Sequence, residues 1–205
     1  MKKYWWIGVL VIIVGGLLVW THFSTGEADT YQTVADNSSL PGIQTGTAPW
    51  TVELTNLKAR LAADGLPALA QEGTALHIHQ HLDLIIDGTP VAVPAEIGIN
   101  EGAGFISPIH VHDTTGVIHV ESPVVKTFTL GQFFDIWGVR FSATCIGGYC
   151  ADATHSLQVW VNGAPYTGDP RMLPLSAHEE IVIAYGTQAE TPTTIPASFA
   201  FAPGL

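Results

Sequence analysis

The chain is poor in basic residues. Of its 205 residues only seven are Lys or Arg, against 18 Asp or Glu, and the formal net charge is −11. So acidic a chain repels a phosphate backbone, which excludes nucleic acid as a partner. The sequence also lacks a glycine-rich phosphate loop and a Gly-x-Ser-x-Gly segment. Neither a P-loop nucleotide site nor the nucleophile of an α/β-hydrolase is therefore predicted.

Charge is scarce overall, and one long segment has none. Charged residues make up 12% of the chain and hydrophobic residues 47%, which excludes disorder throughout. Residues 5–20 contain no charged side chain. At about 1.5 Å per residue, residues 4–23 span roughly 30 Å of hydrocarbon. With Lys2 and Lys3 ahead of them, they predict a single-pass anchor over 1–23, inserted in the lipid bilayer, with a cytoplasmic N-terminus.

A cleaved signal peptide is the alternative interpretation of this segment, because residues 24–26 are small, and cleavage would make the protein secreted. In either case the remainder is expected outside the cytoplasm. Residues 24–50, rich in Thr, Ser and Gly, predict a flexible stalk. Residues 51–205 then form the extracytoplasmic domain.

Cysteine is almost absent: Cys145 and Cys150, in the segment CIGGYC, are the only two. Outside the cytoplasm, such a pair around a Gly-Gly turn predicts a disulfide that closes a small loop. A redox pair and two thiolate ligands are the alternatives, but the spacing differs from the CxxC typical of both.

The pattern of apolar residues predicts a mainly β, α+β domain. Alternating apolar and polar residues over 76–122 predict two hairpins. Over 117–186 the expected order is strand, helix, strand, hairpin, strand, which predicts a β-grasp-like part with one helix on a mixed sheet. The helix is expected over 130–137, after the cap Thr129. Residues 187–205 form a tail rich in Pro and Thr.

Histidine is abundant in these hairpins. Six of the nine His lie there, all on the polar faces of their strands: His77, His79, His81, His110, His112 and His119. Alternate residues lie about 6.6–7 Å apart on one face of a strand, so such a pair can hold one ion with a third ligand from a neighbouring strand. The alternative is a solvent-exposed face that happens to be rich in His. The lack of Lys in both hairpins favours the metal site.

The expected metal is copper or zinc. Met172 is the only methionine after the initiator, which argues against a thioether Cu(I) site. Imidazole with an oxygen ligand from Glu121, Asp113 or Asp83 suits Zn²⁺ or Cu²⁺. Metal binding or handling is favoured over catalysis. The alternatives are a His-ligated metalloenzyme and a non-catalytic cell-surface module that captures a protein partner or self-associates.

The segments HIHQHLDLIIDG and HVHDTTGVIHVES resemble uncharacterised exported, His-rich prokaryotic proteins, so this resemblance implies a recurring family and no particular chemistry. An HxH strand with a third His on its neighbour is similar to the zinc site of α-type carbonic anhydrases. HxH with a later Glu and His also resembles cupins. The segment 110–112 (HVH) resembles the copper-ligand pair of copper–zinc superoxide dismutases. These motifs cover only a few residues, and they imply no catalytic role for any of them.

Overall fold

The computed structural model describes residues 35–205. The anchor expected over 1–23 and the first part of the expected stalk lie outside these residues. Within them, no helix is long and apolar enough to cross a membrane. The described chain is mainly β, with one seven-stranded mixed sheet and two short two-stranded ones, which agrees with the predicted mainly β or α+β class.

The helices are short and the strands vary in length. The helical segments are η1 (Asn37–Ser39), α1 (Leu57–Ala63), η2 (Glu101–Ala103), α2 (Leu130–Trp137) and η3 (Pro170–Met172). The strands are β1 (Leu76–Ile86), β2 (Thr89–Val91), β3 (Ile99–Asn100), β4 (Phe105–Ile106), β5 (Ile109–His110), β6 (Val117–Ser122), β7 (Cys145–Ile146), β8 (Tyr149–Cys150), β9 (His155–Val161), β10 (Ala164–Pro165) and β11 (Glu180–Thr187).

Strand β1 organises the large sheet, whose order is β10-β9-β11-β1-β6-β5 with β2 also paired to β1. The first half of β1 pairs antiparallel with β6, and its second half pairs parallel with β11. Because β1 lies between β6 and β11, residues 117–186 do not form a β-grasp unit by themselves. The expected helix on a mixed sheet is present, but the sheet is complete only with β1.

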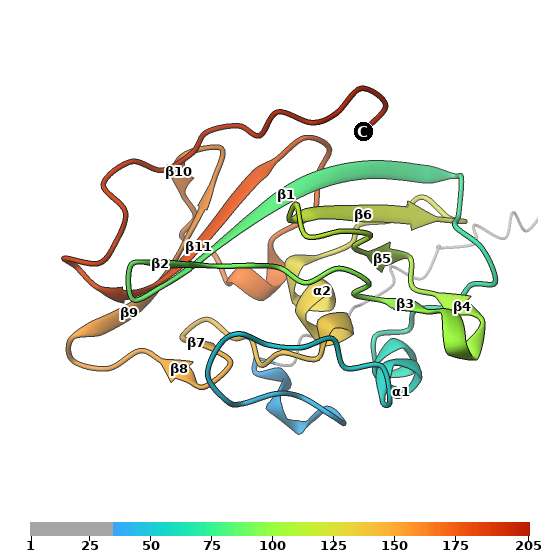
Figure 1. Ribbon diagram of the computed structural model, residues 1–205, viewed down its shortest axis with the longest axis horizontal. Coiled ribbons are helices and arrows are strands. Elements are labelled where there is room, and N and C mark those ends of the chain that lie inside the picture. Colours follow the sequence, from blue (N-terminus) through green and yellow to red (C-terminus); the bar gives the residue numbers. More distant parts are fainter. Residues whose placement is uncertain (1–34) are drawn as a thin grey trace, which may run out of the picture. The chain divides into compact units, whose positions relative to one another are not determined.

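Different segments pack on the two faces of the large sheet (Figure 1). Helix α2 lies against one face, and all its residues are buried. The predicted cap is confirmed, since Thr129 and Gln132 form a reciprocal capping box. The C-terminal segment runs along the opposite face, where Phe199 stacks on His81 with ring centroids 3.8 Å apart. The apolar side chains of β1 thus meet α2, while the His side chains lie on the other face.

The predicted hairpins turn at Asp-Gly and Asn-Gly dipeptides. Asp87 and Gly88 join β1 to β2 with φ of 49° and 72°. Asn162 and Gly163 join β9 to β10 with φ of 50° and 79°. Positive φ at both central residues is the type I′ geometry, which Asp-Gly and Asn-Gly adopt readily and which matches the twist of the flanking strands.

Residues 36–50, expected to belong to a flexible stalk, are packed against the domain instead. The side chain of Asn37 is buried, and its amide donates to Asp135 Oδ1 at 2.6 Å and to the Val139 carbonyl at 3.0 Å. Trp50 is also buried and packs edge-on against Trp137. The polar composition of this segment is typical of a linker and led to that prediction. Composition alone does not reveal which polar side chains form buried hydrogen bonds with the rest of the domain.

The predicted disulfide between Cys145 and Cys150 is present, and it joins the short strands β7 and β8. Replacing both cysteines by serine is expected to lower the free energy of unfolding by about 2 kcal/mol, because a loop this short gains little entropy when it is opened in the unfolded chain. Urea unfolding followed by Trp fluorescence measures the change. Wild-type protein reduced with dithiothreitol serves as the control and should shift equally; an unchanged midpoint in both would contradict the prediction.

Candidate metal centre

The two histidine hairpins lie side by side in one sheet. In the β1–β6 register His79 is opposite His119, and in the β5–β6 register His110 is opposite the same His119. The three side chains therefore form one row across three strands, on the face away from α2. This arrangement follows from the long-range pairing of β1 with β6, which the local sequence pattern does not specify.

Five imidazole rings form a continuous cluster around this row. Nε2 of His77 lies 3.1 Å from Nε2 of His79, and Nε2 of His110 lies 3.1 Å from Nε2 of His112. The ring of His119 lies between the two pairs, with its centroid 4.5 Å from that of His79 and 4.6 Å from that of His112. Ring nitrogens this close to one another can converge on metal ions.

Glu121 supplies a carboxylate to the same cluster. It lies on β6 directly opposite His77, and its Oε1 is 3.2 Å from Nε2 of His77. The same oxygen is 3.2 Å from Nδ1 of His119 and 4.0 Å from Nε2 of His79. Glu121 therefore contacts the His77–His79 pair and the central ring of His119.

Two sets of potential ligands result. In each, one donor atom per residue lies within 4.8 Å of every other: His110, His112, His119 and Glu121 form the first set, and His77, His79 and Glu121 form the second. His79, His110 and Glu121 are buried, whereas the side chains of His77 and His112 are 53% and 42% exposed. The exposed rings lie at opposite ends of the cluster and give solvent access to an otherwise buried group of donors.

Burial keeps the central rings in the neutral form that binds metals. It lowers the pKa of His110 to about 4, despite the opposing hydrogen bond to the Ser107 carbonyl. Burial, together with the neighbouring His79, lowers the pKa of His119 to about 3. Burial also lowers the pKa of His79. At neutral pH each of these rings therefore keeps one unprotonated nitrogen, which is the form of imidazole that binds metal ions.

The pKa of the Glu121 carboxyl group is raised, whereas the pKa values of the central imidazoles are lowered. Burial, with the adjacent Glu72 carboxylate adding repulsion, raises the pKa of Glu121 to about 7. Glu72 also lies 3.5 Å from Nε2 of His112. A cation bound beside the Glu121 carboxylate favours its ionised form.

The pKa values of His110 and His119 predict acid destabilisation of the metal-free protein, which the raised pKa of Glu121 partly offsets between about pH 7 and 4.5. His110 and His119 have folded-state pKa values below the ordinary 6.5, so unfolding takes up protons below that pH. Their contribution to the free energy of unfolding is complete above about pH 6.5 and is lost as the pH falls towards 4 and then 3. Urea unfolding in excess chelator at several pH values measures the slope.

The control for this pH dependence is His119→Gln, which removes one of the two titrations. Its free energy of unfolding should fall less steeply between pH 6.5 and 4, by roughly one proton in the slope. Equal slopes for wild type and variant would show that His119 is not held neutral by the fold.

His81, expected among the ligands, lies in neither set. Its Nδ1 is 2.8 Å from Glu180 Oε2, and its Nε2 donates to the Thr115 carbonyl at 2.8 Å. Burial disfavours the charged ring, but the hydrogen bond to Glu180 outweighs it and raises the pKa of His81. Both ring nitrogens are thus occupied within the protein. Asp83 joins only His81 and Glu180 in a separate group of three.

Asp113 also lies outside both sets. It is exposed in the turn after His112, and its carboxylate accepts from the backbone N–H of Thr115 at 2.8 Å. Hydrogen bonds from the side-chain hydroxyl and the backbone N–H of Thr115 lower the pKa of Asp113. In the structure Asp113 closes the turn between β5 and β6.

Two residues near the cluster escaped the sequence analysis. Glu72 precedes β1 in an irregular segment, where no periodic pattern marks it. His178 lies in the turn before β11, with φ of 61°, and its backbone N–H donates to the His79 carbonyl at 2.6 Å. With His77 and His79 it lines a hollow of about 330 Å³ beside the second set of ligands.

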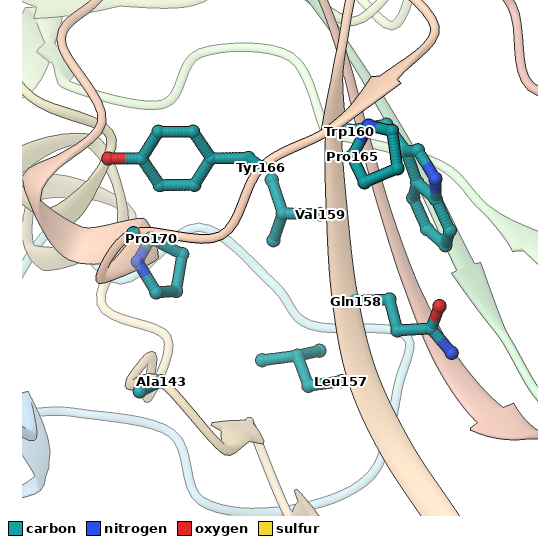
Figure 2. Close-up of a pocket in the computed structure, with 9 residues that line it drawn as sticks. Ala143, Leu157, Gln158, Val159, Trp160, Pro165, Tyr166 and Pro170 are labelled. Carbon is teal, nitrogen blue, oxygen red and sulfur yellow. The ribbon is translucent and has the colours of Figure 1, made fainter.

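A second hollow, of about 220 Å³, lies between β9, β10 and the segment leading into η3 (Figure 2). Tyr166 and Pro170 line one side of it, and Trp160 and Pro165 the other. Trp160 is 7% exposed, pairs with Pro165 across the hairpin and packs on Val182, as core packing predicts. No His, Cys, Asp or Glu lines this hollow, so it offers no metal ligand of these types.

Comparison with known proteins gives no further information about the function of the cluster. No family model, no curated protein and no solved structure matches this chain. The functional argument therefore depends on the geometry of the cluster.

Proposed function

We propose that this protein binds a transition-metal ion, copper or zinc, through the histidine cluster. The observation that carries the proposal is the convergence of five imidazoles and one carboxylate from β1, the β5 segment and β6, with the central rings buried and neutral. A polar face that served only for solubility has no reason to bury His79, His110 and Glu121 beside one another, because burying polar groups is costly.

The available donors favour Zn²⁺ or Cu²⁺. Within the described residues both cysteines form the disulfide, and Met172 lies in η3, 40% exposed. Soft sulfur ligands are therefore not part of the cluster. Imidazole with carboxylate is the donor set of many zinc and copper sites.

We further propose that the protein acts at the extracytoplasmic face of a membrane. The support is the uncharged segment 5–20 behind Lys2 and Lys3 in the sequence, together with the disulfide, which is typical of oxidising compartments. Metal binding or handling at that surface is the role we favour over catalysis.

Elemental analysis of the full chain tests this function. The protein is purified in detergent without a histidine tag or metal column, and we expect at least one copper or zinc ion per chain. Alanine at all five clustered histidines should abolish the metal while the circular dichroism spectrum is retained. A folded wild-type protein that takes up neither Zn²⁺ nor Cu²⁺ more tightly than micromolar would favour an interaction module instead.

A further inference from the structure

We propose that the cluster holds two metal ions bridged by Glu121, one closed by protein ligands and one with a coordination position open to an exogenous donor. This inference rests on the proposed function and specifies how the site is built. It follows from the number of donors, from their division into two sets and from the hollow beside one of them.

The donors are too numerous for one ion. Zinc in proteins is commonly four-coordinate, and the cluster offers five imidazoles and a carboxylate. The donors divide into the two sets defined above, which share Glu121 alone. A carboxylate has two oxygens, and metal ions about 3.5–4 Å apart are the usual geometry of two-metal sites.

The local chain geometry explains this division. Both outer pairs, His77 with His79 and His110 with His112, are separated by one residue and bring their Nε2 atoms to 3.1 Å. The pairs lie on opposite sides of β6, which carries Glu121. Each pair can thus hold its own ion, and the β6 side chains complete both sites from between them.

The charges of the cluster also suit two ions. Neutral imidazoles contribute none of the negative charge that offsets two dications, so carboxylates must supply it. Glu121 lies at the centre, and Glu72 lies beside it and 3.5 Å from His112. Both carboxylates therefore lie where they can offset the charge of bound cations.

The two ions differ in their protein ligands. The first set provides four ligands, which complete the tetrahedral coordination of an ion, as in structural zinc sites. The second set provides three, which leaves one position for water or another small donor, as in catalytic and exchange sites. The hollow of about 330 Å³ lined by His77, His79 and His178 gives such a donor a route to that ion.

Titration of the metal-free full chain with Co²⁺ tests the arrangement, since the visible spectrum of Co²⁺ reports its coordination. Equilibrium dialysis should give two Co²⁺ per wild-type chain, and addition of azide should alter the spectrum. The double variant His77→Ala/His79→Ala should bind one Co²⁺ whose spectrum azide leaves unchanged. His77→Ala alone, at a half-exposed position, should weaken one of the two binding events by more than about tenfold while the other is kept.

The outcomes separate this inference from the proposed function. One Co²⁺ per wild-type chain, with the same stoichiometry in both variants, overturns the two-ion site and leaves metal binding intact. Two ions that Glu121→Gln binds as tightly as wild type overturn the bridge. No Co²⁺, Zn²⁺ or Cu²⁺ bound to folded wild-type protein overturns the function itself.

Discussion

Replacing His119 by alanine is expected to lower the affinity of the protein for Zn²⁺ or Cu²⁺ by more than about 100-fold. Loss of a residue that only supports a ligand typically costs 10–100-fold, and His119 is itself a candidate ligand. Its ring contacts His79 and His112, and its Nδ1 is 3.2 Å from Glu121. Competition with a chromophoric chelator measures the affinity.

His155→Ala is the matched control for this prediction. His155 begins β9 and lies outside the cluster; its Nδ1 is 3.0 Å from Asp152, and with Asp87 and Glu190 it forms a separate, more exposed group of possible ligands. The control should retain wild-type affinity. If His119→Ala binds as tightly as wild type, or if both variants lose affinity equally, the row across β1, β6 and β5 is not the metal site.

Asp135→Ala is expected to lower the free energy of unfolding by about 3–5 kcal/mol, the usual cost of removing one partner of a buried ion pair. Asp135, in α2, and Arg171, in η3, are both fully buried, with Oδ2 2.7 Å from Nη2. The same carboxylate accepts from Asn37 at 2.6 Å. The substitution therefore affects contacts that join α2 to η3 and to the segment before α1. Urea unfolding followed by Trp fluorescence measures the loss.

Asp83→Ala serves as the comparison for that loss. Asp83 is only partly buried on β1, and its replacement should change the free energy of unfolding by less than about 1 kcal/mol. An equally small effect at Asp135 would mean that the buried pair contributes little beyond what an apolar side chain supplies, as some buried ion pairs do.

Local features of the fold could be predicted because they depend on residues close in the sequence. The turn at Asp87-Gly88 needs residues that tolerate positive φ. The start of α2 needs the reciprocal bonds of Thr129 and Gln132. The segment 36–50 could not be predicted in this way, because the burial of Asn37 depends on Asp135, about 100 positions away in the chain.

The candidate site likewise contains some relations that the local sequence predicts and others that depend on long-range contacts. Alternation with period two places His77 and His79 on one face, and the short connection between β5 and β6 places His110 opposite His119, so these relations depend on residues close in the sequence. That Glu121 contacts His77 and His79, and that Glu72 lies nearby, required the pairing of β1 with β6. His81 is on the predicted face, yet Glu180 on β11 and the Thr115 carbonyl occupy both its nitrogens.

The sequence by itself determined which side chains share a strand face, where the turns fall and that the two cysteines pair, because each depends on backbone geometry over a few residues. Only the tertiary structure decided that the two histidine hairpins are neighbours, with β1 between β6 and β11. Strand order is set by the joint packing of apolar faces from distant segments on α2. No local pattern encodes it, and the histidine cluster exists only because of it.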